Sequence, residues 1–217
     1  MTVIGINGSP RKHGNTATLV EHALAGATAT GAHTEIIHLY DLDYKGCTSC
    51  FACKTPGRIS GRCAMEDGLA LVLDKIRDAD ALVLGTPLYF GAATGEMRSF
   101  LERLLFPFLS WDDGTSLFGR ETPVGLIVTM GVTERRMEEF GYGPHLARME
   151  HFLKLIFGQC EAMYVTDTLH VDDYEQYRMK QFDAREKMQR HRDVFPVDCE
   201  KASRLGSRLC RNITVPR

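Results

Sequence analysis

Residues 3–16 read VIGINGSPRKHGNT, in which a short apolar run ends in a polar, glycine-bearing turn and a helical pattern follows at once. The order of strand, tight loop and helix N-terminus builds an anion site. The first backbone N–H groups of a helix have no partner inside the helix, and the helix dipole favours negative charge there. The stretch therefore predicts a phosphate-binding loop.

The side chains of this loop suit a phosphate group. Ser9, Asn15 and Thr16 supply neutral hydrogen-bond donors, and Arg11 and Lys12 supply positive charge. The glycine spacing matches neither the dinucleotide fingerprint Gly-x-Gly-x-x-Gly nor the triphosphate loop Gly-x-x-x-x-Gly-Lys-Ser/Thr. The alternative, an ordinary strand-to-helix turn with a Ser or Asn cap, stays open from this stretch alone.

Length and composition indicate one α/β domain with some decoration, because the chain has 217 residues, 44% of them apolar and 25% charged. A formal net charge of −2 gives no field that would attract nucleic acid. The first strand begins at Thr2 or Val3, which leaves no room for a signal peptide, and no run approaches the ~20 apolar residues of a membrane span. We therefore expect a cytoplasmic protein with no nucleic-acid or membrane partner.

Strand and helix patterns alternate along the chain. Apolar or alternating runs predict five strands, over 3–7, 34–39, 81–85, 124–129 and 161–166. Helical spacing predicts five helices, over 15–29, 67–77, 96–106, 145–157 and 174–192. This alternation implies a parallel sheet with helices on both faces. Residues 196–217 are rich in arginine and receive no assignment.

Three loops, 8–16, 86–95 and 129–131, follow predicted strands. Ligands of open parallel sheets bind beyond the carboxyl ends of the strands, so these loops can converge on one ligand. The second loop contains Thr86-Pro87-Leu88-Tyr89-Phe90-Gly91, whose aromatics, proline and glycine suit a flat, partly polar ring. An ordinary loop with two half-buried aromatic side chains is the alternative.

Cysteine is unevenly distributed, because four of the seven cysteines lie within residues 47–63. A secreted disulfide framework would scatter its cysteines more evenly. In a reducing compartment, such crowding indicates a metal, an iron–sulfur cluster or redox chemistry.

Taken together, the motifs resemble the NADPH-dependent FMN reductase family of the flavodoxin-like fold. The resemblance rests on Gly8-Ser9-Pro10-Arg11 with Gly14-Asn15-Thr16, on Thr86 to Gly91, and on the amphipathic helix start at Met97 to Arg103. It runs from residue 1 to about 166. It implies an α/β protein, a three-layer α/β/α sandwich whose five-stranded parallel sheet has the order 2-1-3-4-5. We therefore expect an FMN-binding domain over 1–170, with a cysteine-rich insertion at 46–63, and a C-terminal helical extension over 171–217.

The resemblance also implies how FMN is bound. The first loop would hold the phosphate through Ser9, Arg11, Asn15 and Thr16. The second loop would run along the isoalloxazine ring through Pro87, Leu88, Tyr89, Phe90 and Gly91. Thr129 and Gly131 in the third loop would help to close the ring site. No side chain needs to act as acid or base, because the chemistry belongs to the flavin.

The cysteine loop looks like that of the iron–sulfur flavoprotein branch of the family. Cys47, Cys50 and Cys53 follow the pattern Cys-x2-Cys-x2-Cys, and Cys63 can complete an all-thiolate shell for a [4Fe–4S] cluster. The gap of nine residues, 54–62, is longer than in that branch's compact motif. A four-thiolate zinc site and metal-free thiols are the alternatives.

We therefore expect an FMN-dependent oxidoreductase that passes electrons to a small acceptor such as a flavin or quinone. A cluster would suit ferredoxin as the donor, and its absence would favour direct hydride transfer from NAD(P)H. Two alternatives are an electron carrier reduced by ferredoxin without NAD(P)H activity, and a zinc-stapled flavodoxin-like binding protein. The family resemblance implies a homodimer or tetramer, with the cysteine loop near a neighbouring subunit's flavin.

Overall fold

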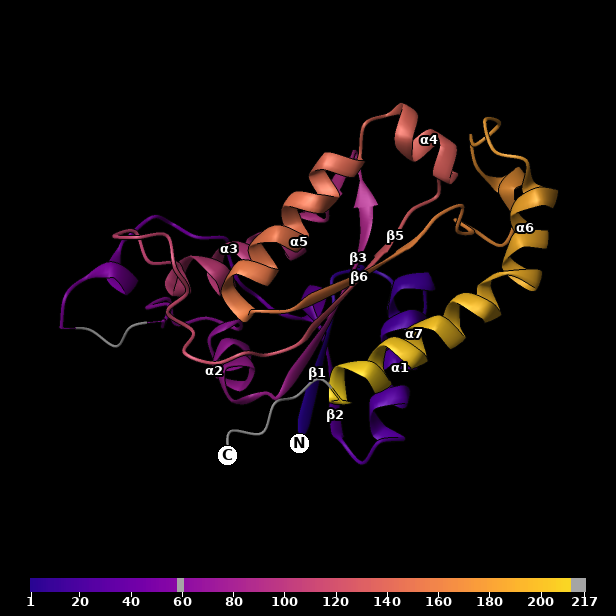
Figure 1. Cartoon of the computed structure of the whole chain (residues 1–217). Coiled ribbons are helices and arrows are strands. Elements are labelled where there is room, and N and C mark those ends of the chain that lie inside the picture. Colours follow the sequence, from indigo (N-terminus) through magenta and orange to yellow (C-terminus); the bar gives the residue numbers. More distant parts are fainter. Residues whose placement is uncertain (58–60, 212–217) are drawn as a thin grey trace.

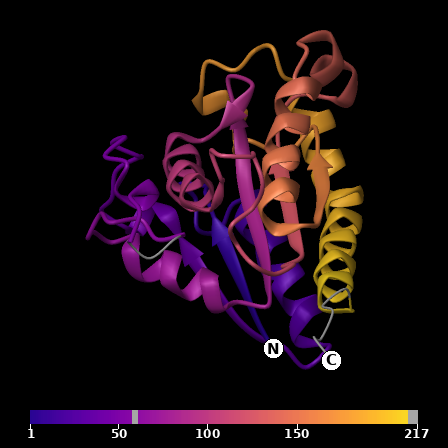
Figure 2. The ribbon, with the colours of Figure 1, turned by 60° about the vertical axis from the view of Figure 1, so that its left-hand side comes forward.

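A computed structural model describes residues 1–57 and 61–211. Its centre is a parallel sheet between two layers of helices (Figures 1 and 2). The parallel strands are β1 (Thr2–Asn7), β2 (His33–His38), β3 (Ala81–Tyr89), β5 (Val124–Thr129) and β6 (Cys160–Val165). Their order is β2-β1-β3-β5-β6, and the short β4 (Ala92–Ala93) pairs antiparallel with the end of β3. The predicted flavodoxin-like fold and strand order are confirmed.

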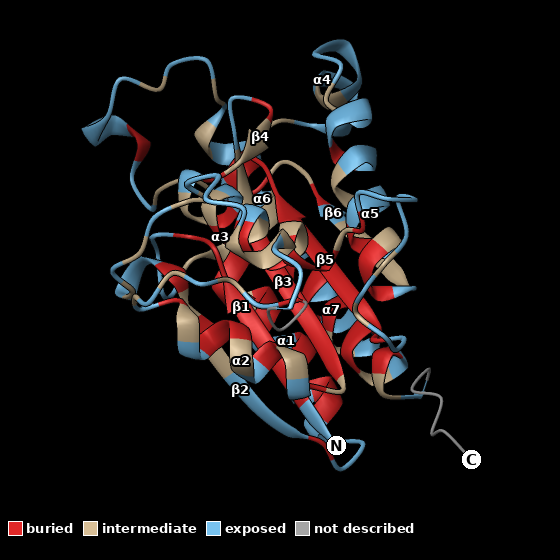
Figure 3. Cartoon of the chain, turned by 90° about the vertical axis from the view of Figure 1, so that its left-hand side faces the viewer, coloured by how far each residue is buried: buried red, intermediate tan, exposed pale blue. Residues whose placement is uncertain are grey.

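The central strands are buried on both faces, as the continuous apolar runs predict. Figure 3 shows β1, β3 and β5 as the buried core of the molecule. One face of the sheet packs against α2 (Ala70–Asp78), α3 (Gly95–Leu105) and α5 (Gly143–Phe157). The other face packs against α1 (Asn15–Thr28) and α7 (Phe195–Arg211).

Shorter elements decorate the loops. They are η1 (Leu39–Asp41), η2 (Ala52–Lys54), η3 (Phe106–Phe108), α4 (Glu134–Glu139), η4 (Tyr174–Gln176) and α6 (Ala184–Asp193). In the part of the chain that the structure describes, no helix is long and apolar enough to cross a membrane.

The helix predicted over 174–192 is wrong over most of its first half. The side chain of Asp173 caps η4, and that of Asp183 accepts hydrogen bonds from the backbone N–H groups of Arg185 and Glu186 at the start of α6. Each capping aspartate starts a separate helix, because it bonds N–H groups that have no partner within the helix. The intervening charged residues have no apolar stripe that would join the two helices.

Helix α7 lies in the stretch that received no assignment from the sequence. Its buried residues recur at helical spacing and include Phe195, Cys199, Ala202, Leu205 and Leu209. This face packs on α1 and on the sheet.

The backbones of α1 and α7 approach very closely at two glycines. A Cβ atom added at Gly26 would lie 1.9 Å from the carbonyl oxygen of Ser203, and one at Gly206 would lie 1.8 Å from that of Ala23. In the same contact, the hydroxyl of Ser207 donates to the carbonyl of Gly26 at 2.9 Å. These glycines let α7 complete the helix layer that also contains α1.

Replacing Gly206 with alanine is expected to destabilise the fold, because the new methyl group would force the two backbones apart. Overpacking costs about 1–3 kcal/mol, which outweighs the ~1 kcal/mol gained from the higher helix propensity of alanine. The measurement is the free energy of unfolding in urea. Gly143→Ala is the control, since nothing lies within 4 Å of a Cβ at that helical glycine. Equal stability of the two variants would contradict the close packing.

Candidate functional site

The loop after β1 is preformed by its own hydrogen bonds. The side chain of Asn7 accepts from the backbone N–H of Ser9 at 3.0 Å and donates to its carbonyl at 3.3 Å. The hydroxyl of Ser9 accepts from the N–H of Arg11 at 3.1 Å, and the N–H of Gly8 donates to the carbonyl of Gly85 at 2.8 Å. The backbone of this loop is therefore fixed without a ligand.

The N-terminus of α1 is open. Its N-cap residue is Gly14, so that no side chain from the described residues caps the first N–H groups. The hydroxyls of Thr16 and Thr129 are buried and 2.7 Å apart, which joins the first loop to the end of β5. This geometry keeps the backbone N–H groups of the helix start available for an anion.

Arg11 and Asn15 contact the segment that follows β6. Arg11 donates to the carbonyl of His170, and the amide of Asn15 donates to the carbonyl of Leu169 at 2.7 Å. These side chains line a cavity of about 820 Å³ between the first loop and residues 169–177. Both cationic and amide donors thus lie at the mouth of the first loop.

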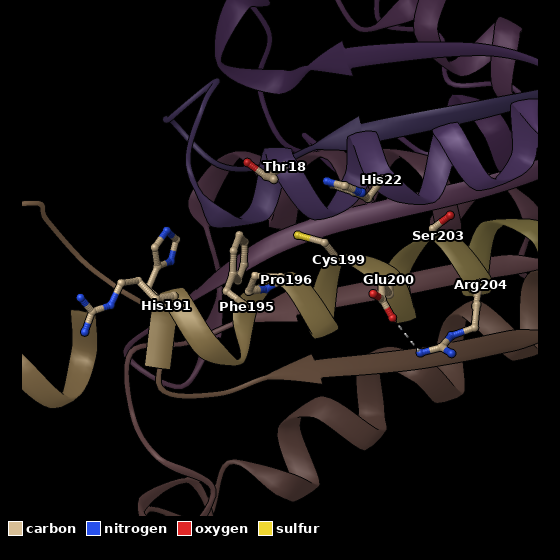
Figure 4. A pocket seen from close by; sticks show the side chains of 10 residues that line it. Thr18, His22, His191, Phe195, Pro196, Cys199, Glu200, Ser203 and Arg204 are labelled. Atoms are coloured by element: carbon tan, nitrogen blue, oxygen red, sulfur yellow. Dashed lines mark ion pairs between the residues drawn. The ribbon is translucent and has the colours of Figure 1, made fainter. Parts of the chain in front are cut away.

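A neighbouring cavity of about 750 Å³ lies between α1 and the N-terminal half of α7. Figure 4 shows Thr18 and His22 of α1 opposite Phe195 and Cys199 of α7. The two cavities share Thr18, Phe195 and His191. The groove between the helices therefore continues to the first loop.

The second loop is a hairpin. Strand β3 continues beyond its predicted end to Tyr89, and Leu88 and Tyr89 pair with Ala93 and Ala92 of β4. Phe90 and Gly91 form the turn with φ angles of 51° and 79°, both in the left-handed region. Phe90 at the tip is fully exposed, and Tyr89 beside it is also exposed.

Buried hydrogen bonds place the three predicted loops side by side. The hydroxyl of Thr94, after the hairpin, donates to the carbonyl of Gly8 at 2.7 Å, and the hydroxyl of Thr86 accepts from the N–H of Thr94 at 3.3 Å. Pro87 is paired in register with Thr129. The loops therefore meet at one edge of the sheet.

Sequence reasoning missed a fourth strand-end segment, residues 167–170, which covers the third loop. A Cβ added at Gly131 would lie 1.9 Å from Nε2 of His170. The buried Lys187 of α6 donates to the carbonyl of Gly131 at 2.5 Å and pairs with Asp167. Burial lowers the pKa of His170, and the charges of Lys187 and Arg11 lower it further. The signal was available, since this segment also follows a parallel strand.

The four clustered cysteines line one small cavity, together with Glu102, Arg103 and Phe106. Ser49 and Phe51, on either side of Cys50, have φ angles of 54° and 56°. Such angles are uncommon for residues other than glycine, and these two wind residues 47–53 into a compact turn. Burial raises the pKa of the Cys53 thiol.

The four thiols leave almost no free space between them, because the cavity that they line has a volume of only about 10 Å³. Across residues 1–57 and 61–211, no three His, Cys, Asp or Glu side chains gather closely enough to hold a single metal ion. All seven cysteines are free, and Cys50 is exposed. The donor set suits an all-thiolate cluster, but the exposed side of the loop would have to swing outward to accommodate one.

Helix α3 and η3 hold the cysteine loop. The carboxylate of Glu102 accepts from the backbone N–H of Cys47 at 3.1 Å. Lys54 donates to the carbonyls of Pro107 (3.4 Å) and Leu109, at the end of η3. The rings of Phe51, Phe106 and Trp111 pack edge to face with centroids 5.4–5.9 Å apart. The loop is thus docked on α3, the helix that begins after the β3–β4 hairpin.

Comparison with known proteins identifies the family. Residues 1–139 match the model of a protein family described as NADPH-dependent FMN reductase. The chain belongs to this family. The predicted family is therefore confirmed, and the chain is a member of a family of flavin-dependent reductases.

Relatives of this FMN reductase family member include proteins named iron–sulfur flavoproteins. One from Methanocaldococcus jannaschii is 39% identical over 103 residues, which are 48% of this chain and 51% of that protein. One from Archaeoglobus fulgidus is 41% identical over 103 residues, which are 48% of each chain. The chain spans about half the length of the curated relatives it matches.

The fold is shared with an NAD(P)H:quinone oxidoreductase from Methanothermobacter marburgensis. The TM-score is 0.67 with 14% sequence identity, over 96% of both chains. At this identity, the likeness supports the flavodoxin-like fold alone.

Proposed function

We propose that the protein is an FMN-dependent oxidoreductase with a [4Fe–4S] cluster on Cys47, Cys50, Cys53 and Cys63. It would take electrons from NAD(P)H or ferredoxin and pass them to a small acceptor such as a flavin or quinone. The observation that carries the proposal is the convergence of four thiols on one cavity, next to a sheet edge where three strand-end loops meet. Relatives named iron–sulfur flavoproteins support it.

The first loop would hold the FMN phosphate. Ser9 fixes the loop backbone, the uncapped start of α1 offers N–H groups, and Thr16 contributes through its backbone because its hydroxyl is bonded to Thr129. Arg11 and Asn15 would exchange the carbonyls of residues 169–170 for phosphate oxygens. Charge-assisted bonds of this kind are stronger than neutral ones, so the exchange is favourable.

The isoalloxazine ring would lie along Pro87 to Gly91, with Thr129 and Gly131 on its other side. The flavin supplies two-electron and one-electron chemistry when it is bound. The chain's own residues orient the ring and exclude water. Because His170 covers Gly131 and is held by the hydroxyl of Tyr174 at 3.0 Å, it would close this side of the site.

The function is tested by anaerobic purification with flavin, iron, sulfide and zinc measured per chain. We expect one FMN and about four irons and four sulfides. Cys50→Ala should lose iron and sulfide but retain FMN, while Cys199→Ala, in α7, should keep all three. Zinc without sulfide, or flavin without any metal, would overturn the cluster, and the absence of flavin after adding FMN would overturn the flavin site. With the cluster present, reduction by ferredoxin but not by NAD(P)H would identify an electron carrier.

The phosphate role of Arg11 predicts a selective loss of affinity. Arg11→Met removes a charge-assisted hydrogen bond worth about 1.5–3 kcal/mol, which is roughly a tenfold to hundredfold weaker binding of FMN. Riboflavin lacks the phosphate, so its affinity should not change. Fluorescence titration of the apoprotein with both flavins measures this. Lys75→Met, which breaks the surface ion pair with Glu35, is the control. An equal loss for both flavins would exclude the phosphate role.

We also propose that a second copy of the chain binds the apolar groove between α3 and α5. The groove has a volume of about 750 Å³ and contains exposed aromatic side chains such as Trp111 (63%) and Phe152 (40%). Its walls include Leu88 and Gly91 of the hairpin as well as Cys47 and Phe51 of the cysteine loop. Contiguous apolar surface of this kind favours a protein interface. A second copy here would bring each cysteine loop near its neighbour's flavin loop.

Phe152→Glu is expected to convert the proposed dimer or tetramer into monomers of 24.3 kDa. An unpaired charge in the buried interface costs about 3 kcal/mol or more, or roughly a hundredfold in association. Light scattering after gel filtration gives the mass. Leu71→Glu, an equally drastic change at an exposed position of α2, should leave assembly intact. An unchanged mass for Phe152→Glu would place the interface elsewhere.

A further inference from the structure

Arg103 is the largest fully buried side chain of the molecule, among the described residues, with 1% of its surface exposed. It lies near the end of α3 and lines the cavity of the four cysteines. A buried cation is costly unless it is paired and hydrogen-bonded. Its place beside four thiols therefore requires a physical reason.

Two of its three guanidinium nitrogens are accounted for. Nη1 donates to the carboxylate of Asp67 at 2.5 Å and to the carbonyl of Lys45 at 3.2 Å. Nη2 donates to the carbonyl of Met65 at 3.2 Å. Lys45 precedes the first cysteine and Met65 follows the last, so that Arg103 ties together the two ends of the cysteine loop.

The third nitrogen, Nε, is buried and has no hydrogen-bond partner in the described parts of the chain. Cys63 and Arg103 line the same small cavity. Burial lowers the pKa of Arg103, but hydrogen bonding to Asp67 and the proximity of Cys63 outweigh it and raise that pKa. The group is therefore a fixed cation with one nitrogen, Nε, that has no partner among the residues that the structure describes.

We propose that Arg103 is a positioning residue whose Nε–H, free in the described part of this structure, would donate to the sulfur of Cys63 when the cluster is bound and would favour the reduced state of the cluster. This inference rests on the proposed function. Reduction adds one electron to the cluster and breaks no bond, so the cluster becomes more negative by one charge. Hydrogen bonds to the sulfurs and nearby charge set the potential of such clusters. Arg103 holds the backbone at Met65, two residues after Cys63, so an outward swing of Cys50 need not move Cys63 away from the guanidinium.

Other charged side chains lie in or near the cysteine loop, and of these Glu102 also lines the cavity. Glu102 accepts from the N–H of Cys47, and Lys54 lies above the ring of Phe106 at 4.8 Å. Asp67 pairs with Arg103 but is 21% exposed, whereas the guanidinium is completely buried. Asp67 also opposes the effect of the cation, and this gives the inference a second, independent test.

The experiment is an anaerobic redox titration of the holoprotein, with the reduced cluster followed by electron paramagnetic resonance. Arg103→Met should lower the equilibrium constant for one-electron reduction by about tenfold or more, with each factor of ten equal to 59 mV. Asp67→Asn leaves the cation uncompensated and should shift the potential in the opposite direction. Arg103→Lys should fall between Arg103→Met and the wild type. Arg204→Met, which breaks an exposed pair with Glu200 on α7, should change nothing.

Opposite shifts of the reduction potential in Arg103→Met and Asp67→Asn distinguish an electrostatic role from simple loosening of the loop. Loosening would shift the potentials of both variants in the same direction. Unchanged potentials, or shifts of the same sign, would overturn the inference. If Arg103→Met fails to retain the cluster, Asp67→Asn and Arg103→Lys decide the question. A wild-type protein without iron and sulfide would instead overturn the cluster in the proposed function, so that the two failures are distinguishable.

Discussion

The structure depends on two buried hydroxyl contacts that hold three strand ends together. Thr16 is bonded to Thr129, and Thr94 is bonded to the carbonyl of Gly8. The parallel strands place the three loops at one edge, and these two hydrogen bonds, each 2.7 Å long, fix the spacing between the loops. Since all the polar groups concerned are buried, losing any one would leave an unpaired partner at a cost of about 1–3 kcal/mol. The loops are thus preorganised for a ligand.

Helix α3 connects this edge to the cysteine loop. Its N-cap, Thr94, also accepts from the N–H of Met97 at 3.3 Å, while Glu102 and Arg103 near its other end hold the loop. Nine helical residues at 1.5 Å each separate Thr94 from Arg103, which is about 14 Å. A single rigid element therefore sets the separation of the proposed flavin and cluster sites within one chain. Figure 1 shows the cysteine loop on the side of the molecule away from α6 and α7.

The sheet and the meeting of its strand-end loops could be predicted from the sequence because their signals are local. Apolar runs followed by glycine-bearing loops indicate strand ends, and four cysteines within 47–63 are visible in the composition. The charged contributors were not predictable in this way. Arg103 and Lys187 occur in helical patterns that indicate solvated faces, and their burial depends on partners 36 and 20 residues away, Asp67 and Asp167. Likewise, three arginines of α7 mask the helical spacing of its buried face.

The gap between Cys53 and Cys63 is longer than in the compact motif. Because the cysteine loop is anchored at both ends, the length of this gap need not change the placement of the four thiols. Arg103 fixes the backbone at Lys45 and Met65, outside the four cysteines, so that both ends are set by α3. Doubling the length of a flexible loop costs only about 0.6 kcal/mol of closure entropy. Gly57, within this gap, has a φ of 80°, and nothing in the described parts of the chain lies within 4 Å of a Cβ atom added there. Since the cavity is defined by its anchors, extra residues within the gap need not change which thiols face one another.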